Sequence, residues 1–284
     1  MRIDTTNYLA YLVLSTFQAQ YFIKIHPATS IKTMVKNLFG LIGYPLSHSF
    51  SKKYFTAKFK REEIPDCLYD LFPLDNIEEI EELITNHPNL VGLNVTIPYK
   101  QAVLPFLDKL DVSAAAVGAV NTIKLENGRR VGYNTDVYGF QTSLEALINE
   151  KYEPNTSLKG LILGTGGASK AVAFVFNQLD IDYQYVSRNP KPNQLAYTDL
   201  NPIIIEEHLV IVNTTPLGMS PSINTCPDLP YELITAQHLL YDLVYNPEVT
   251  LFLKKGLLKG ATTKNGLDML HGQAEKSWAI WRGL

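Results

Sequence analysis

The 284-residue chain has few of the features that mark secreted or membrane-spanning proteins. It holds only two cysteines, Cys67 and Cys226, far apart in sequence and without metal-ligand spacing. Two free thiols in a reducing compartment fit this pattern better than a disulfide framework, so we expect a cytoplasmic protein. No uninterrupted apolar run reaches the roughly 18 residues that a transmembrane helix needs. The six histidines are scattered, and we expect no metal site.

Neither sign of charge dominates the chain. It carries 25 Lys and Arg against 28 Asp and Glu, a formal net charge of −3, and its basic residues form no cluster. Such a chain has no electrostatic field for holding a nucleic acid or an anionic membrane, and we expect neither as a partner. The 46% of hydrophobic residues is typical of a globular protein, and the length favours two domains.

Residues 1–33 fit the rest of the chain poorly. Their short apolar run, at 8–14, lacks the basic start and the small-residue cleavage site of a secretory signal. Met34 stands just before the first clear strand pattern. We therefore expect residues 1–33 to be a peripheral extension of the fold.

The most informative stretch is a glycine turn at 164–170, which reads Gly-Thr-Gly-Gly-Ala-Ser-Lys. An apolar run at 161–163 that suits a buried parallel strand precedes it, and an amphipathic segment at 171–179 follows. Glycines let the backbone turn sharply and approach a pyrophosphate, whose charge the free N–H groups of a helix N-terminus can bind. The layout predicts a dinucleotide site; a plain tight turn is the alternative.

Predicted strands and helices alternate from residue 38 onward, which favours an α/β fold. In the first half we expect strands at 38–43, 68–72 and 90–95, helices at 53–59 and 77–84, and an antiparallel hairpin at 119–125 and 130–133. In the second half we expect strands at 160–163, 183–187, 209–213, 239–243 and 261–264, and helices at 137–148, 171–179 and 266–281. The sequence predicts two domains: a mixed, mostly parallel sheet domain and a Rossmann-like domain.

The last predicted helix has an apolar face. Its apolar residues at helical spacing, which we expect to pack in the core, are Leu267, Leu270, Ala274, Trp278 and Trp281. The polar stretch at 150–155 is expected to be a linker.

Polar residues follow several predicted strands of the first half. They are Ser49, Ser51, Asn94, Thr96, Lys100, Asn121 and Asp136. Because ligands bind at the carboxyl ends of strands in open α/β sheets, these residues suit a small ligand rich in hydroxyl groups, and serine hydroxyls can also bind a carboxylate. The alternative for each is a cap of a helix or turn.

Lys100 and Asp136 are the pair that we assign to chemistry. A lysine beside a carboxylate can donate a proton to an alkoxide forming on a carbonyl, while the carboxylate positions the lysine. A solvated surface charge is the alternative for a lysine in this position.

The cofactor is predicted from the end of the strand after the glycine turn. In NAD sites an acid about 20 residues beyond the glycines binds the ribose 2′-hydroxyl, whereas an arginine binds the 2′-phosphate of NADP. Residues 186–189 read Val-Ser-Arg-Asn, with no acid at this strand end. Arg188 therefore favours NADP(H); an exposed structural arginine is the alternative.

From about residue 38 to the C-terminus, the chain resembles the shikimate dehydrogenases. The matching stretches are His-Ser-Phe-Ser at 48–51, Asn-Val-Thr-Ile-Pro-Tyr-Lys at 94–100, Gly-Ala-Val-Asn-Thr at 118–122, Asn-Thr-Asp at 134–136, the glycine turn at 164–170, Asn-Thr-Thr-Pro-Leu-Gly-Met at 213–219, Asp-Leu-Val-Tyr-Asn-Pro at 242–247 and Gly-Leu-Asp-Met-Leu-His-Gly-Gln at 266–273. Together and in this order they are highly specific.

The resemblance implies an NADP-dependent oxidoreductase that reversibly reduces 3-dehydroshikimate to shikimate in the shikimate pathway of aromatic amino-acid biosynthesis. It implies a substrate-binding domain at 34–134 plus 266–284 and a nucleotide-binding domain at 135–265, with a deep cleft between them.

The resemblance also assigns roles to matching residues. Ser49 and Ser51 would hold the substrate carboxylate, Thr96, Asn121 and Gln273 its ring hydroxyls, and Lys100 with Asp136 the reacting oxygen, with Tyr245 also beside the substrate. The residues implied for the cofactor are Gly164, Gly166, Gly167, Ala168, Ser169, Arg188, Thr214, Gly266 and Met269.

Three departures from the family pattern affect these expectations. Lys52 stands where the family usually has proline, so the turn after Ser51 is expected to be less rigid. Ser187 and Asn189 flank Arg188 where asparagine and threonine are usual, and Lys191 could supply a second charge. NADP use is the transferred expectation that these departures affect most.

Several alternatives stay open at this point. They are a quinate/shikimate dehydrogenase with NAD or mixed cofactor use, a catalytically silent nucleotide-binding regulator, and a small-molecule binding protein without a redox cofactor. The chain could act as a monomer or a homodimer.

Overall fold

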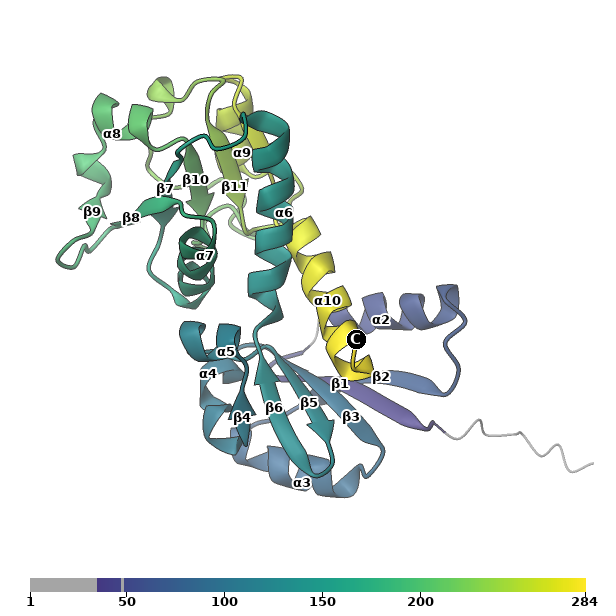
Figure 1. The fold of residues 1–284 in the computed structure, drawn as a ribbon. Helices are drawn as coiled ribbons and strands as arrows, with labels where there is room; N and C mark the ends of the chain where they lie inside the picture. Colours follow the sequence, from purple (N-terminus) through teal and green to yellow (C-terminus); the bar gives the residue numbers. More distant parts are fainter. Residues whose placement is uncertain (1–34, 47–48) are drawn as a thin grey trace, which may run out of the picture.

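The computed structural model describes residues 35–46 and 49–284. The chain forms two six-stranded sheets covered by helices, joined by two long helices (Figure 1). This arrangement confirms the predicted α/β fold class. The predicted peripheral extension at 1–33 and His48 of the 48–51 motif lie outside the described residues.

The first sheet is mixed, with the strand order β2-β1-β3-β5-β6-β4. Its strands are β1 (Asn37–Gly43), β2 (Cys67–Pro73), β3 (Leu90–Val95), β4 (Lys109–Leu110), β5 (Thr122–Glu126) and β6 (Arg129–Tyr133). Strand β1 pairs in parallel with β2 and β3, and β5 pairs antiparallel with β3 and β6. The predicted hairpin is therefore confirmed, although its first strand starts at residue 122 and not at 119. The two residues of β4 are too few for a sequence pattern to reveal.

The helices of the first half lie on both faces of this sheet. They are α2 (Phe50–Arg61), α3 (Ile80–Asn86), α4 (Tyr99–Ala102) and α5 (Val112–Val117), with 3₁₀ turns at Ile77–Glu79 and Leu104–Phe106. Helix α5 was not predicted, but its ends carry clear signals. The Asp111 side chain accepts hydrogen bonds from the N–H groups of residues 113 and 114, and Gly118 ends the helix at φ +67°.

The second sheet is parallel throughout, with the strand order β12-β11-β10-β7-β8-β9. Its strands are β7 (Lys159–Leu163), β8 (Asp182–Ser187), β9 (Leu195–Ala196), β10 (Val210–Asn213), β11 (Leu239–Asp242) and β12 (Thr262–Lys264). Counted within this sheet, the order is the one found in dinucleotide-binding domains. The strand order reverses between β7 and β10, so the glycine turn after β7 lies at the topological switch point.

Helix α7 (Gly167–Gln178) covers one face of the second sheet. The shorter helices α8 (Pro202–Glu207) and α9 (Leu251–Leu257) cover the other face, with 3₁₀ turns at Tyr197–Asp199 and Tyr231–Leu233. Between β8 and β9 the proline-containing segment forms no helix, as its composition predicts.

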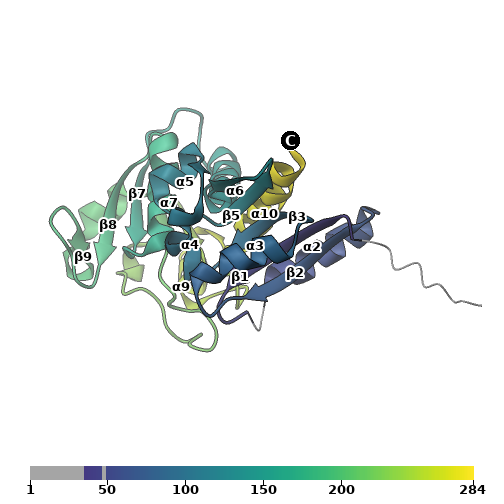
Figure 2. The same cartoon turned by 90° about the horizontal axis from the view of Figure 1, so that it is seen from below.

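Helices α6 (Thr135–Lys151) and α10 (Leu267–Arg282) lie side by side and join the two halves (Figures 1 and 2). Their backbones touch: a Cβ on Gly139 would lie 2.3 Å from the Met269 carbonyl oxygen, and one on Gly272 would lie 3.1 Å from the Gly139 Cα. Helix α6 continues to Lys151, so the predicted linker at 150–155 was placed two residues too early.

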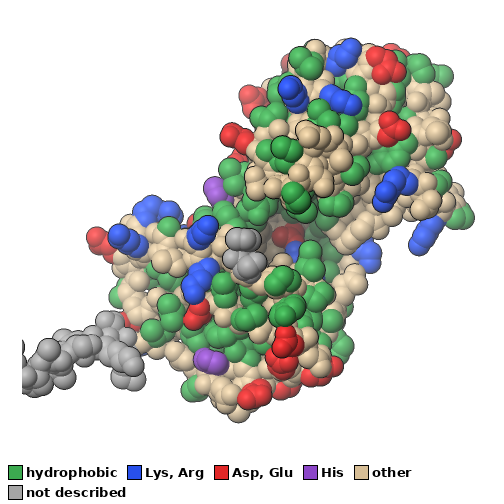
Figure 3. All heavy atoms as spheres, turned by 180° about the vertical axis from the view of Figure 1, so that it is seen from behind, with side chains coloured by type: hydrophobic (Ala, Val, Ile, Leu, Met, Phe, Trp, Pro, Cys, Tyr) green, Lys and Arg blue, Asp and Glu red, His purple; other side chains and the backbone are tan. Residues whose placement is uncertain are grey.

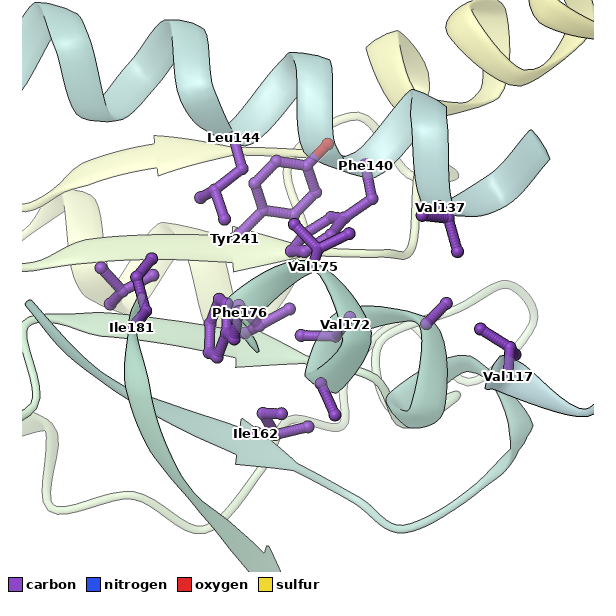
Figure 4. Packing of buried hydrophobic residues seen from close by; sticks show 14 of the residues in the cluster. Val117, Val137, Phe140, Leu144, Ile162, Val172, Val175, Phe176, Ile181 and Tyr241 are labelled. Atoms are coloured by element: carbon purple, nitrogen blue, oxygen red, sulfur yellow. The ribbon is translucent and has the colours of Figure 1, made fainter. Parts of the chain in front are cut away.

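The two long helices belong to different hydrophobic cores. Phe140 and Leu144 of α6 pack with Phe176 of α7 and Tyr241 of β11 against the second sheet (Figure 4). The buried hydrophobic residues of α10, which are Ala274, Trp278 and Trp281, pack with Phe39, Phe55 and Tyr69 against the first sheet. The prediction of core packing was wrong for Leu267 and Leu270, which are only half-buried. The first turn of α10, which carries Leu267 and Leu270, lies outside the core of the first half.

We predict that Gly139→Ala destabilises the protein. The new methyl group would meet a backbone carbonyl that cannot rotate away, so the free energy of unfolding should fall by about 1–3 kcal/mol. This loss would occur although alanine favours an isolated helix by about 0.5–1 kcal/mol. Urea unfolding followed by circular dichroism measures the change. Thr142→Ala, on the exposed face of the same helix, is the control, and equal stability of the two variants would contradict the prediction.

Candidate active site

The surface is hollowed between the two halves of the molecule. Seen from behind, acidic and basic side-chain atoms lie inside this hollow (Figure 3). Helices α4 and α6 each begin beside the first sheet, and each contributes a charged residue from its first turn.

Lys100 and Asp136 form an ion pair. The Lys100 Nζ lies 2.7 Å from the Asp136 Oδ2, and the two side chains are 36% and 22% exposed. The backbone holds both residues: the Lys100 carbonyl accepts a hydrogen bond from the Val120 N–H at 2.7 Å, and Asn134 caps helix α6 just before Asp136. The structure thus brings the predicted pair together, and both charged groups remain accessible to a ligand.

A buried polar network lies directly behind this pair. Asn121 accepts the Thr135 N–H at 2.7 Å and donates to the Thr135 hydroxyl at 3.0 Å. The Thr122 and Ser277 hydroxyls lie 2.7 Å apart, and Asn94 donates to both. Among the described residues, no buried side-chain nitrogen or oxygen lacks a hydrogen-bond partner. The network therefore fixes Asn121 between β3, β5, α6 and α10.

Sequence reasoning missed three members of this network: Thr122, Thr135 and Ser277. Thr122 and Thr135 stand inside the stretches 118–122 and 134–136, so their motifs contained a signal. Ser277 had one weak signal, its position one helical turn beyond Gln273, whose carbonyl accepts from the Ser277 hydroxyl at 2.8 Å.

Ser49 and Ser51 lie at the start of helix α2. Ser49 is the N-cap: its Oγ accepts the Lys52 N–H at 3.3 Å, which leaves its own O–H free to donate. A proline at position 52 would have no such N–H to offer. The Lys52 ammonium also pairs with Asp70 of β2 at 2.6 Å, so the first turn of α2 is tied to the sheet. These two contacts of Lys52 restrain the turn after Ser51, at the position where the family usually has proline.

The remaining residues predicted to bind substrate come from the loop after β3, the loop after β11 and helix α10. Thr96 follows β3, and its N–H donates to the Ile42 carbonyl at 2.9 Å. Gln273 is 8% exposed, and its Nε2 donates to the Leu270 carbonyl at 3.0 Å, so its side-chain oxygen stays free to accept. Tyr245 is 42% exposed after β11.

The glycine turn after β7 opens onto free space. Gly164 takes φ +104°, and its N–H donates to the Val186 carbonyl at 2.8 Å. Gly166 caps helix α7 without any side-chain hydrogen bond, and a Cβ on Gly166 or Gly167 would meet nothing within 4 Å. The N–H groups at this helix start are therefore available to an anion.

A cavity of about 680 Å³ lies in front of this turn. Four residues predicted to bind the cofactor line it: Gly164, Gly166, Arg188 and Thr214. Among the described residues that line it, Arg188 is the only cation and Asp228 the only acid, and Lys191 lies outside the lining. Sequence reasoning missed its other wall, formed by Tyr197, Thr198, Cys226 and Asp228 from two loops without a recognisable motif.

The other predicted cofactor residues lie around this cavity or beyond it. Gly167 and Ala168 are exposed at the start of α7, whereas Ser169 is buried with its hydroxyl donating to the Gly166 carbonyl at 2.7 Å. Gly266 is packed so closely on the Leu243 carbonyl that a Cβ would lie 2.2 Å from its oxygen. Met269 packs partly against the core of the second half, with Leu243.

The two cysteines are free thiols in different places. Cys226 lines the cavity beside the glycine turn, whereas Cys67 lines a separate cavity of about 430 Å³ beside Trp278 and Trp281. Residues 35–46 and 49–284 contain no cluster of three or more His, Cys, Asp or Glu placed to hold a metal ion. None of the helices in the same ranges combines the length and apolar character needed to cross a membrane.

Comparison with known proteins agrees with this geometry. Residues 41–123 match the sequence model of the shikimate dehydrogenase substrate binding domain. The chain is 38% identical over 264 residues to the shikimate dehydrogenase (NADP(+)) of Desulforamulus reducens, covering 86% of this chain and 89% of that one.

Two solved structures have the same fold. The shikimate dehydrogenase of Aquifex aeolicus superposes with a TM-score of 0.75 at 33% identity, covering 88% of this chain and 93% of that one. The shikimate 5-dehydrogenase of Thermus thermophilus, solved in complex with NADP(H) and shikimate, superposes with a TM-score of 0.75 at 29% identity, covering 87% and 94%. The identity to the Desulforamulus enzyme over most of both chains is decisive: this chain belongs to the shikimate dehydrogenase family.

Proposed function

We propose that the protein is an NADP-dependent shikimate dehydrogenase that reversibly reduces 3-dehydroshikimate to shikimate. The observation that carries the proposal is the partly exposed Lys100–Asp136 ion pair at the starts of helices α4 and α6, in a chain that joins a mixed sheet to a dinucleotide-type sheet. A proton donor for a carbonyl oxygen and a glycine turn fit for a dinucleotide together make a site for carbonyl reduction.

The substrate is held by hydrogen-bonding groups of the first half and α10. The Ser49 hydroxyl can donate to the substrate carboxylate, because its lone pair already accepts the Lys52 N–H. Ser51, in the first turn of α2, is the second carboxylate contact. The ring hydroxyls are bound by Thr96, Asn121 and Gln273, and Tyr245 closes the site from the side of the second sheet. Family membership supports the assignment.

The Lys100 ammonium donates the proton to the substrate oxygen during reduction and recovers it in the reverse direction. Asp136 has two tasks: its carboxylate holds the ammonium at 2.7 Å, and it accepts a hydrogen bond from the substrate hydroxyl. Asn134 and Thr135 position the helix start that carries Asp136, because both are tied to the 119–121 segment.

The residues around the glycine turn fit an NADP(H) molecule. Open space in front of Gly166 and Gly167 and the uncapped N–H groups of α7 suit a pyrophosphate, and Arg188 suits a 2′-phosphate. When bound, the reduced nicotinamide supplies the hydride. Gly164 and Thr214 line the cavity wall, and Ala168 and Ser169 belong to the first turn of α7. Gly266 and Met269 contact the nicotinamide at the start of α10.

The domain boundaries that we propose follow the two cores. Residues 34–134 with 266–284 make the substrate-binding domain, since the buried face of α10 packs on the first sheet. Residues 135–265 make the nucleotide-binding domain, since α6 packs on the second. The proposed oligomeric state is a monomer or a homodimer, and two free thiols suit the cytoplasm.

We predict that Lys100→Ala lowers kcat by about 10²- to 10⁴-fold, because the proton donor is lost. Shikimate oxidation with NADP, followed by absorbance at 340 nm, measures the effect, and circular dichroism checks that the variant is folded. The control is Lys109→Ala, because Lys109 is an exposed lysine in strand β4 of the first sheet. This variant should keep normal activity. A loss of only a few-fold in Lys100→Ala would refute the catalytic role. Parallel assays with quinate and NAD test the alternative substrate and cofactor.

We predict that Arg188→Ala weakens NADPH use by about 10- to 100-fold and leaves NADH use nearly unchanged. A charge-assisted hydrogen bond to the 2′-phosphate contributes about 1.5–3 kcal/mol, and NADH has no such phosphate. The comparison is between the KM values for the two cofactors. Lys191→Ala is the control, because Lys191 lies outside the cavity lining. Equal effects of Arg188→Ala on both cofactors would rule out 2′-phosphate recognition by this residue.

A further inference from the structure

Asp242, the last residue of β11, is a buried carboxylate to which the proposed reaction gives no task. Its exposed fraction is 0%, and no cation pairs with it among the described residues. Three donors surround it instead. The Asn213 Nδ2 donates to its Oδ1 at 2.9 Å, the Val244 N–H donates to the same oxygen at 3.0 Å, and the Thr250 hydroxyl donates to its Oδ2 at 2.5 Å.

The Asn213 contact connects Asp242 to the cavity beside the glycine turn. The side-chain oxygen of Asn213 accepts both the N–H of Thr215 at 3.0 Å and its hydroxyl at 2.7 Å. Thr215 lines that cavity, and a Cβ on Gly164 would lie 2.9 Å from its methyl group. A relay of hydrogen bonds therefore runs from Asp242 through Asn213 to the residue that packs on the glycine turn.

The Val244 contact connects the same carboxylate oxygen to the other side of the site. Val244 precedes Tyr245, and its carbonyl accepts the Gly266 N–H at 3.2 Å. Thr250 caps helix α9, which follows this loop. One oxygen, Asp242 Oδ1, thus joins the last residue of β10 to the loop after β11. The loops after β10 and β11 also meet where the Ser220 N–H donates to the Asn246 carbonyl at 3.2 Å.

We propose that Asp242 is a positioning residue for the dinucleotide: through Oδ1 it holds Thr215 and Val244 in the arrangement that binds NADP(H). The proposal rests on the proposed function, because it takes the cavity and Gly266, whose N–H donates to the Val244 carbonyl, to belong to the cofactor site. Asp242 touches neither substrate nor cofactor, so its effect is on cofactor affinity and not on the proton transfer at Lys100.

The charged groups on elements packed around Asp242 are engaged elsewhere. Lys255 of α9 lies over the Tyr231 ring, 4.4 Å from its centre, and Lys264 of β12 pairs with Asp268. Lys254 of α9 is exposed. Tyr231 is the titratable group nearby, and burial raises the pKa of its hydroxyl, which donates to the Pro227 carbonyl at 2.9 Å. The groups that donate hydrogen bonds to Asp242 are therefore all neutral.

The first test compares Asp242→Ala with the wild type. We expect the KM and the calorimetric dissociation constant for NADPH to rise about tenfold or more, with the shikimate KM unchanged within about threefold. A purely structural role would lower the amount of folded enzyme but would not separate the two KM values. In Asp242→Asn the amide oxygen can accept at the Oδ1 position and the NH₂ can donate to Thr250, so this variant should stay within about threefold of the wild type.

Controls separate this proposal from the proposed function. Asp182→Ala, an exposed aspartate at the opposite end of the same sheet, should leave NADPH affinity unchanged. Hydrogen exchange of the cofactor-free protein should show faster exchange of the Thr215 and Val244 amides in Asp242→Ala than in the wild type. If Asp242→Ala does not fold, Asn213→Ala interrupts the relay and should also weaken NADPH binding. Normal NADPH affinity in the folded variant overturns the proposal, whereas lack of turnover in the wild type overturns the proposed function.

A pH series tests the buried charge itself. Burial raises the pKa of the Asp242 carboxyl from 3.8 to about 6, and the hydrogen bonds from Thr250, Val244 and Asn213 oppose that shift. The folded state therefore holds this proton more tightly than the unfolded state, so deprotonation costs stability as the pH rises from about 4 to about 6. Asp242→Asn lacks this cost. We expect the Tm of the wild type relative to that of Asp242→Asn to fall across this window and then stay level, and a constant difference from pH 4 to pH 8 would contradict the expectation.

Discussion

Backbone contact between helices α6 and α10 is the constraint on which the rest of the structure depends. The two helices meet at Gly139 and Gly272, where neither position has room for a side chain. Helix α6 buries its apolar face on the second sheet, and α10 buries its own on the first. Because each helix is anchored in a different core, their contact sets how the two sheets face each other. The hollow between the two halves, in which acidic and basic side-chain atoms lie, is shaped by that contact (Figure 3).

Each side of the hollow is then held by a buried polar network. On the first sheet, Asn94, Thr122 and Ser277 link three elements behind Asn121 and Asp136. On the second sheet, Asp242 and Asn213 link the loops after β10 and β11. Buried polar groups are costly unless all their hydrogen bonds are made, so each network favours a single arrangement of the residues attached to it. The Lys100–Asp136 pair, by contrast, stays accessible and keeps its charges available for chemistry.

The sequence predicted most strands and the long helices because their patterns are local. The run before the glycine turn, the hairpin predicted at 119–125 and 130–133, and the apolar face of α10 each follow from the spacing of residues within one segment. Short elements were missed: β4 has only two residues, and helix α5 has only six, although Asp111 and Gly118 mark its ends. Leu267 and Leu270 fit the helical spacing but lie only half-buried, since periodicity shows which face is apolar and not where the covering core ends.

By itself, the sequence determined the α/β class, the glycine turn for a dinucleotide, the candidate pair Lys100 and Asp136, and the family resemblance. Each of these is written in residue types and short spacings. The tertiary structure alone decided that Lys100 and Asp136 touch, that Ser277 joins Asn94 and Thr122, and that Asp242 serves two loops. These contacts join residues far apart in the chain, and their geometry is set by the packing of sheets and helices, which no local pattern specifies.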